Sequence, residues 1–207
     1  DQCALYRLRN KRLLAKLLSM PTKEIEKIIS SNSNYNVFEI NKGTDKARKI
    51  EHPKRSLDTI QERIFFLLKR VKTPDYLYSG VKGVSPIKNA KLHLGNGSLI
   101  KLDVVKFYPS TTFRHVFSFF KDMMKCDSDV AAVLTKLSTY EGHLPTGSRI
   151  SQILAFYSHK PLFDELYSLS KKYDLKMSVW VDDIVFSGKK SSPEILRMAK
   201  KIRFMTS

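Results

Sequence analysis

Three aspartates in two separate stretches could together hold a divalent metal ion. Asp182 and Asp183 are adjacent and lie between two β-type runs, at 176–180 and 184–186. This pattern predicts a β-hairpin with two carboxylates at its tip. An Asp pair between strands is more often an ordinary turn. However, adjacent carboxylates repel each other, and a divalent cation offsets that repulsion, so the pair is a candidate half of a magnesium site.

The third carboxylate lies about eighty positions upstream. Asp103 interrupts an apolar, β-branched run at 99–105 that predicts a buried strand, where an unpaired charge would be costly. In one interpretation, Asp103 lies at a strand edge and is satisfied by a neighbouring Lys. In the other, it faces Asp182 and Asp183, and three carboxylates surround two Mg²⁺ ions roughly 4 Å apart.

Helices and short strands must position these residues. Apolar spacing predicts amphipathic helices at 4–18 and 56–71, a short helix after Pro21, a helix face through Phe113, Val116, Phe117, Phe120 and Met124, and another helix at 130–137. Strands are predicted at 37–40 and 47–51 around a turn at Gly43. Ser85 and Pro86 predict a helix start. A long helical pattern after 150 is predicted to kink at Pro161, and a basic helix begins near Ser192.

The composition indicates a folded protein that binds a polyanion. The 207 residues are 42% apolar and carry a formal charge of +17, which suits one large domain or two small subdomains and a nucleic-acid partner. Two cysteines are too few for a disulfide framework or a thiolate zinc site, which fits a reducing cytoplasm. No apolar run is long enough to span a membrane.

Three motifs carry a resemblance to a known family. The segments D-V-V-K-F-Y-P-S (103–110), L-P-T-G-S-R-I-S-Q-I-L-A (144–155) and W-V-D-D-I-V-F-S-G (180–188) resemble three successive palm motifs of a reverse transcriptase. The motif sequences are most similar to those of the bacterial retron-type and defence-associated enzymes. The segment S-P-I-K-N-A-K-L-H-L (85–94) is also similar to what precedes the first Asp in that group. The resemblance covers roughly 48–188.

This resemblance implies a fold and an activity. The fold would be α+β, a polymerase palm of antiparallel sheet packed on helices with a helix-rich fingers subdomain. Residues 1–95 would form the N-terminal helices and fingers and 96–207 the palm, with a fingers insertion around 112–145 and no thumb in this chain. The implied activity is RNA-directed DNA polymerisation by two Mg²⁺ ions, with Mn²⁺ as a substitute. The implied partners are an RNA template with a DNA primer or an RNA–DNA hybrid, deoxynucleoside triphosphates, and an effector protein or a further copy, with no membrane.

The resemblance also assigns roles to individual residues. The implied catalytic residues are Asp103, Asp182 and Asp183. The implied metal ligands are these three residues and Val104. The residues expected to contact the nucleotide are Arg48, Lys49, Val104, Phe107, Tyr108 and Gly147. The residues expected to contact the primer or template are Pro145, Ser148 and Trp180. Tyr108 would exclude ribonucleotides by collision with the 2′-hydroxyl, or else pack in the core. The chain departs from the family at four positions: Thr146, Arg149 and Phe156 replace the usual Gln, Pro and Asn, and Trp180 replaces Tyr.

Two other functions fit the same sequence. One is a defence-associated reverse transcriptase that makes DNA without a template or primes on protein, which the departures at Thr146, Arg149 and Trp180 favour. The other is a non-catalytic scaffold that binds nucleic acid and keeps the motifs as elements of its fold. The intact set of three acidic residues argues against the scaffold.

Overall fold

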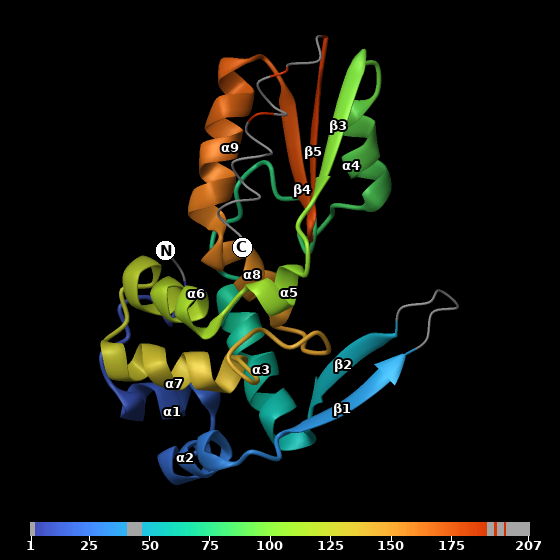
Figure 1. Ribbon diagram of the computed structural model, residues 1–207. Coiled ribbons are helices and arrows are strands. Elements are labelled where there is room, and N and C mark those ends of the chain that lie inside the picture. Colours follow the sequence, from blue (N-terminus) through green and yellow to red (C-terminus); the bar gives the residue numbers. More distant parts are fainter. Residues whose placement is uncertain (1–2, 41–46, 190–192, 194–196, 198–207) are drawn as a thin grey trace. The chain divides into compact units, whose positions relative to one another are not determined.

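The chain folds into two compact units of mixed helix and sheet. The computed structural model describes residues 3–40, 47–189, 193 and 197. Unit 1 comprises Asp1–Lys72 and Thr111–Ser158, and unit 2 comprises Thr73–Ser110 and His159–Ser207 (Figure 1). The mixed α and β composition agrees with the predicted class. These boundaries differ from the predicted ones at 1–95 and 96–207. Residues 73–95 group with unit 2, and the segment inserted into unit 1 extends from Thr111 to Ser158 rather than over about 112–145.

Unit 1 is mainly helical. Its helices are α1 (Lys11–Leu18), α2 (Thr22–Ser30), α3 (Arg55–Leu68), α6 (Phe113–Ser118), the π-helical turn η1 (Phe119–Met123), α7 (Ser128–Ser138) and α8 (Ser151–Ser158). The predicted apolar stripe of α3 is confirmed, because Ile60, Ile64, Leu67 and Leu68 are buried. On the predicted face from Phe113 to Met124, Val116, Phe120 and Met124 are buried, and the π-helical turn adds Phe119 to the core.

The first helix is shorter than predicted. It begins at Lys11 rather than at residue 4, because Asn10 has an extended backbone and its side chain accepts a hydrogen bond from the Leu13 N–H at 2.9 Å. Leu5 and Leu8 are nevertheless buried, so their apolar character reflects core contacts made outside a helix.

An antiparallel hairpin completes unit 1. Strands β1 (Tyr35–Ile40) and β2 (Arg48–Pro53) pair in register from Tyr35 with Pro53 to Ile40 with Arg48, which confirms the two predicted strands. The predicted turn at Gly43 lies outside the described residues, as does the predicted helix after Ser192 apart from residues 193 and 197.

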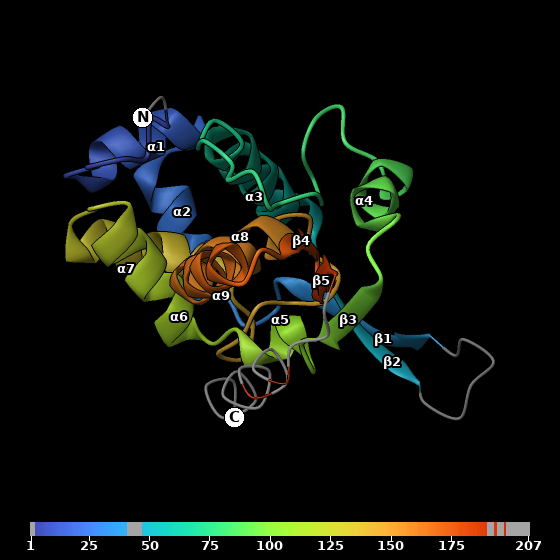
Figure 2. The same cartoon turned by 90° about the horizontal axis from the view of Figure 1, so that it is seen from above.

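Unit 2 is built on a three-stranded antiparallel sheet with the order β3–β5–β4. The strands are β3 (Ser98–Asp103), β4 (Lys176–Trp180) and β5 (Asp183–Gly188), and β4 and β5 form the predicted hairpin. The remaining elements are α4 (Pro86–His93), α5 (Phe107–Ser110) and α9 (Lys160–Lys172). Figures 1 and 2 show α9 and α4 on opposite sides of this sheet.

The strand that carries Asp103 is an edge strand and not the predicted buried one. It ends at Asp103, and exposed and half-buried residues alternate along it. Leu99 is 58% exposed, and Val105, beyond the strand, is 70% exposed. The prediction was wrong because a β-branched run does not distinguish a central strand from an edge strand whose second face is open.

Helix α4 is fixed to the sheet through His93. As predicted, Ser85 caps this helix, its side chain accepting from the Lys88 N–H at 3.2 Å, and Pro86 occupies the first turn. The buried His93 lies within hydrogen-bond distance of two serine hydroxyls of the sheet, Ser187 at 2.7 Å and Ser178 at 2.8 Å. His93 is therefore a satisfied structural residue.

The long helical pattern after residue 150 forms two helices. Helix α8 ends at Ser158 and α9 begins at Lys160, with His159 between them. Pro161 lies in the first turn of α9, where its missing N–H costs no helical hydrogen bond. The proline therefore starts a helix rather than kinking one. In the part of the chain that the structure describes, no helix combines the length and apolar character that crossing a bilayer requires.

Candidate active site

The structure brings the three aspartates together in unit 2. Asp103 ends β3, and Asp182 and Asp183 lie at the turn between β4 and β5, where Asp103 and Asp183 are direct cross-strand partners. Each aspartate offers a carboxylate oxygen, and these oxygens all lie within 4.8 Å of one another. Asp103 is exposed and the other two are half-buried. We call these three residues the acidic cluster.

Burial and the neighbouring negative charges raise the pKa of one member of the acidic cluster. Burial raises the pKa of the Asp182 carboxyl above its ordinary value, and the negative charges of Asp103 and Asp183 raise it further. A backbone hydrogen bond and the nearby Lys101 act in the opposite direction. Concentrated negative charge of this kind is what a divalent cation neutralises.

Lys101 is a member of the site that the sequence did not single out. It precedes Asp103 by two positions, so both side chains leave the same face of β3. Its ammonium lies 2.9 Å from Asp183 Oδ2, and this hydrogen bond raises the pKa of Lys101. A neighbouring Lys was one interpretation for Asp103, but the ion pair that Lys101 forms is with Asp183. The sequence offered a signal in the two-residue spacing between Lys101 and Asp103.

The turn that presents Asp182 is held from outside the hairpin. Val181 has a left-handed backbone (φ 57°), which is strained for a β-branched residue. Its N–H donates to the buried Ser79 hydroxyl at 2.9 Å, and the Val104 N–H donates to the Asp182 carbonyl at 2.9 Å. The segment before Ser79 also pairs with β4, through an isolated bridge between Leu77 and Val179. Nothing in the sequence pattern pointed to Ser79.

The three predicted aromatic residues lie in unit 2, as the acidic cluster does. Phe107 is buried and Tyr108 half-buried, with ring centroids 5.7 Å apart, at the start of α5. Trp180 is half-buried at the end of β4, opposite Asp183 across the strands. Val104 follows β3 directly. Val104 is thus next to Asp103 in the chain and Trp180 is paired with Asp183, while Phe107 and Tyr108 belong to the helix that follows β3.

The remaining predicted residues belong to unit 1, where the loop at 144–150 packs against β2. A Cβ atom at Gly147 would lie 2.8 Å from the Glu51 carbonyl oxygen, and the Gly147 N–H donates to that oxygen at 3.2 Å. The Thr146 hydroxyl donates to the Lys49 carbonyl at 2.8 Å. The resemblance assigns Gly147 a nucleotide contact, and in this fold the backbone that Gly147 approaches is that of β2.

The other side chains of this loop also have partners within unit 1. The Ser148 hydroxyl donates to Gln61 at 2.6 Å, and Pro145 is buried. The Arg149 guanidinium makes a bidentate contact with the Asp58 carboxylate, through Nε at 3.0 Å and Nη2 at 2.8 Å. Its Nη1 donates to the Glu62 carboxylate at 2.5 Å. Arg149, which departs from the family pattern, therefore ties the loop to α3.

The two predicted phosphate-binding cations on β2 differ in their surroundings. The Lys49 ammonium lies 3.1 Å from Glu51 and 3.5 Å from Glu141, and these carboxylates raise its pKa. Glu51 is 3% exposed and also contacts His143 at 3.1 Å. Among the described residues, Arg48 has no ion-pair partner. Arg48 is therefore the better candidate for an incoming phosphate group.

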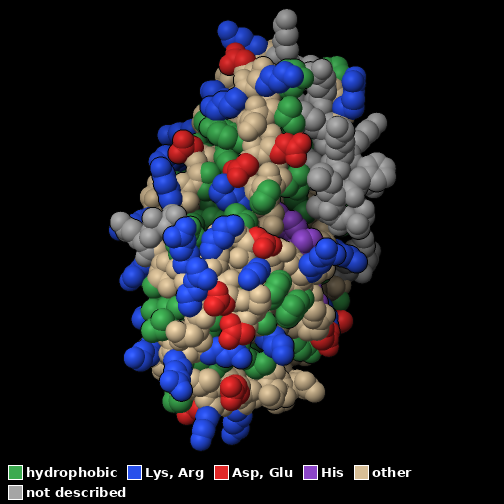
Figure 3. Space-filling model, turned by 90° about the vertical axis from the view of Figure 1, so that its left-hand side faces the viewer, with side chains coloured by type: hydrophobic (Ala, Val, Ile, Leu, Met, Phe, Trp, Pro, Cys, Tyr) green, Lys and Arg blue, Asp and Glu red, His purple; other side chains and the backbone are tan. Residues whose placement is uncertain are grey.

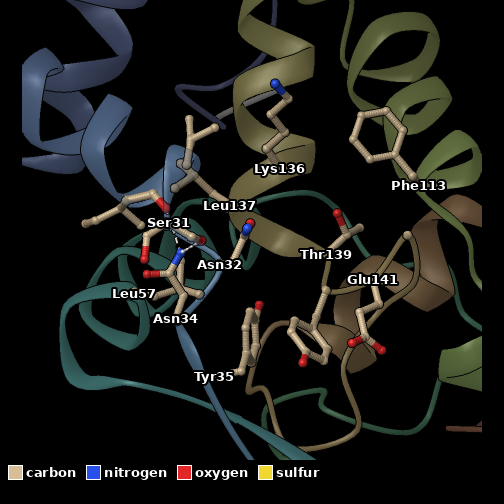
Figure 4. Close-up of a pocket in the computed structure, with 14 residues that line it drawn as sticks. Ser31, Asn32, Asn34, Tyr35, Leu57, Phe113, Lys136, Leu137, Thr139 and Glu141 are labelled. Carbon is tan, nitrogen blue, oxygen red and sulfur yellow. Dashed lines mark hydrogen bonds between the residues drawn. The ribbon is translucent and has the colours of Figure 1, made fainter.

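Unit 1 also contains a pocket of about 440 Å³ between α2, α7 and β1 (Figure 4). Tyr35 and Tyr140 both line this pocket, with ring centroids 4.6 Å apart. The Asn34 amide, which also lines it, donates to the backbone carbonyls of Ile28 and Ser31. None of the predicted site residues lines this pocket.

On the face of the molecule that Figure 3 shows, positive charge is distributed. In Figure 3 the Lys and Arg side chains are scattered across the face shown rather than gathered into one patch, and Asp and Glu side chains are interspersed among them. This distribution agrees with the formal charge of +17. It suits long-range attraction of a polyanion more than a single narrow phosphate site.

The curated proteins similar to this chain include reverse transcriptases of bacterial retrons. Retron Se72 reverse transcriptase of Salmonella heidelberg is 34% identical over 203 residues, which cover 94% of this chain and 52% of that protein. Retron Ec86 reverse transcriptase of Escherichia coli is 26% identical over 164 residues, covering 78% and 51%. Retron Mx65 reverse transcriptase of Myxococcus xanthus is 29% identical over 174 residues, covering 75% and 40%. The chain thus spans about half the length of the curated relatives it matches. No protein-family model matches it.

Proposed function

The chain belongs to the retron-type bacterial reverse transcriptases, and from this premise we propose that it is the nucleotide-joining part of an RNA-directed DNA polymerase. The acidic cluster carries the proposal, because three carboxylates from two separate stretches of the chain converge at one end of an antiparallel sheet. Since the chain spans about half of its relatives, the activity is proposed for the intact protein.

In this proposal unit 2 is the polymerase palm and unit 1 the fingers. The antiparallel sheet with helices on both sides, and the position of the acidic cluster at a hairpin tip, support the assignment of unit 2. The helix-rich composition of unit 1 and its basic hairpin support the other.

The residues of the acidic cluster fit two divalent cations. Carboxylate oxygens are the ligands that Mg²⁺ and Mn²⁺ prefer, and oxygens within 4.8 Å of one another can share a bound ion. A second ion about 4 Å away is proposed by analogy with two-metal nucleotidyl transfer. Asp103, Asp182 and Asp183 would supply the side-chain oxygens, and Val104 its backbone carbonyl. When bound, the ions lower the pKa of the primer 3′-hydroxyl and neutralise charge on the triphosphate and the leaving pyrophosphate.

The chain's own residues position the reactants. The hydrogen bonds of Val181 and Val104 fix the direction of the Asp182 backbone, so the cluster is preorganised. Arg48 would hold the triphosphate of the incoming nucleotide by charge-assisted hydrogen bonds, with Lys49 in a supporting role. Tyr108 would exclude a 2′-hydroxyl, and Trp180 would pack against the primer end. Gly147 would contact the incoming nucleotide, and Pro145 and Ser148 would contact the primer or template.

The proposed substrates are deoxynucleoside triphosphates and an RNA template annealed to a DNA primer. The reaction forms a bond between the primer 3′-oxygen and the α-phosphorus and breaks the bond from that phosphorus to pyrophosphate. The distributed positive charge supports binding of the template and primer backbones. The proposal includes magnesium as the working ion and a role in a retron.

Primer extension tests the proposal. The intact protein is incubated with an RNA template, a DNA primer, the four deoxynucleotides and Mg²⁺, beside Asp182→Asn and the control Asp174→Asn. Asp174 is an exposed residue with a left-handed backbone (φ 52°) that Asn also adopts readily, so the control removes a carboxylate without strain. We expect full activity in the control and a loss of several orders of magnitude in Asp182→Asn. Equal activity of Asp182→Asn and wild type would refute the assignment.

Sequencing of the product separates this activity from template-independent synthesis. The engagement of Thr146 and Arg149 in contacts within unit 1 favours that second candidate, because these side chains replace the family's usual Gln and Pro. A product complementary to the supplied RNA supports RNA-directed synthesis. A product without relation to the template supports the alternative.

A further inference from the structure

Lys101 places a positive charge of the chain itself beside the acidic cluster. Its ammonium lies 2.9 Å from Asp183 Oδ2. Among the ion pairs of the described residues, this one alone involves the cluster. The oxygen that Asp183 would give to a metal ion therefore belongs to a side chain that already has a cation next to it.

The strand register makes this position specific. Asp103 and Asp183 are direct partners across β3 and β5, and Lys101 is partnered with Val185. Lys101 thus stands diagonally across from Asp183 on the same face of the sheet, within reach of a long side chain. The side chain of a lysine one position earlier or later in the strand would project from the opposite face of the sheet.

The chemistry of lysine suits a counter-ion that can leave. An ammonium group is a compact, strongly hydrated charge on a flexible stem, and it does not fork onto a carboxylate as a guanidinium does. The Lys101 side chain is 57% exposed, so water can replace Asp183 as its partner. An exposed pair of this kind is weak enough for a divalent cation to displace.

We propose that Lys101 is a built-in counter-ion that competes with divalent cations for Asp183 and so lowers the affinity of the acidic cluster for them. The lysine relieves the repulsion among the three carboxylates while no metal is bound. Metal binding exchanges the ammonium for the ion at Asp183. This inference rests on the proposed metal site and adds a residue that sets its affinity.

Manganese binding measures this competition independently of polymerase activity. Mn²⁺ is titrated into the intact protein, and free Mn²⁺ is followed by electron paramagnetic resonance, for wild type, Lys101→Met and Lys176→Met. Lys176 is the matched control, because it is exposed, lies on the same face of the same sheet, and has no ion-pair partner among the described residues. We expect Lys101→Met to bind Mn²⁺ about tenfold more tightly than wild type, since a unit charge a few ångströms from the ion is removed. Lys176→Met should stay within about twofold.

A second background tests the route of the effect. In Asp183→Asn the ammonium has no carboxylate at that position to compete for, so adding Lys101→Met should change the affinity by much less than it does in wild type. An equal gain in both backgrounds would show a general charge effect and overturn the competition.

The outcomes separate the two proposals. Equal Mn²⁺ affinities of wild type and Lys101→Met overturn the role of Lys101 and leave the metal site intact. Binding that is undetectable in both proteins overturns the metal site and the inference together. Tight binding in Lys101→Met alone supports both, and circular dichroism spectra of all variants verify that they fold.

Discussion

Replacing Asp182 with Asn is expected to stabilise the metal-free protein even as it removes the proposed activity. Asp182 is partly buried beside two other carboxylates, and its raised pKa records the cost of keeping it ionised. Asn has nearly the same shape but no charge, so the substitution relieves repulsion without creating a cavity. A site built for cations therefore predicts opposite effects on stability and on function.

The size of the stabilisation follows from the geometry. The carboxylate oxygens of the acidic cluster lie within 4.8 Å of one another, and two unit charges at that distance repel by about 0.9 kcal/mol in water. Asp182 has two such neighbours, while the charge of Lys101 offsets part of this repulsion and salt screens part of it. We expect a gain of about 1 kcal/mol in the free energy of unfolding, or an increase in Tm of about 2–4 °C for a chain of this size.

Thermal unfolding followed by circular dichroism measures this gain. Wild type, Asp182→Asn and the exposed control Asp174→Asn are melted at low ionic strength in EDTA and then in Mg²⁺. Mg²⁺ should raise the Tm of wild type and have much less effect on Asp182→Asn. The folded pKa of Asp182 lies above its unfolded value. Wild-type stability from this group is therefore present at low pH and is lost as the pH rises through the folded pKa. The advantage of the variant should accordingly be largest at neutral pH and shrink on acidification.

Two results would refute this reasoning. If Asp182→Asn melts below wild type in EDTA, the carboxylate stabilises the metal-free fold and the three charges do not repel as the geometry requires. If Mg²⁺ raises the Tm of both proteins equally, the ion binds elsewhere.

Three further predictions concern other parts of the molecule. Gly147→Ala should destabilise the protein by about 1–3 kcal/mol in urea unfolding, because the new methyl group would press on the Glu51 carbonyl. Burial lowers the pKa of His93, so its contribution to stability is fully present above about pH 6.5 and is lost as the pH falls through the folded pKa; His93→Gln should flatten this acid side of a Tm–pH profile. Arg48→Ala should raise the KM for deoxynucleotides more than Lys49→Ala, because two carboxylates already hold Lys49.

Each of these predictions has a control. Gly97→Ala adds a methyl group 3.7 Å from the Lys189 carbonyl, an ordinary contact distance, and should cost little; an equal cost at both glycines contradicts the close packing of Gly147. His52→Gln, at an exposed histidine, is the matched control for the substitution itself. Equal KM values for the two β2 variants would show that the ion pairs of Lys49 do not withhold it from the nucleotide.

The sequence alone determined the local elements and the identity of the acidic cluster. Apolar periodicity located the core helix α3 and the hairpin of β4 and β5, because side-chain direction repeats with a fixed period in each kind of element. Ser85 and Pro86 marked the start of α4, since capping depends on residues next to each other in the chain. Three ordered motifs sufficed to single out Asp103, Asp182 and Asp183.

The tertiary structure decided which neighbour each side chain has. Only the strand order shows that β3 lies at an edge with one open face, and only the register brings Lys101 to Asp183. In the same way, the packing of the loop at 144–150 on β2 gives Gly147 its backbone neighbour and Arg149 its two carboxylates. These contacts join residues that lie roughly eighty to a hundred positions apart. Local patterns set the direction of a side chain, whereas the partner that it meets depends on how distant segments pack.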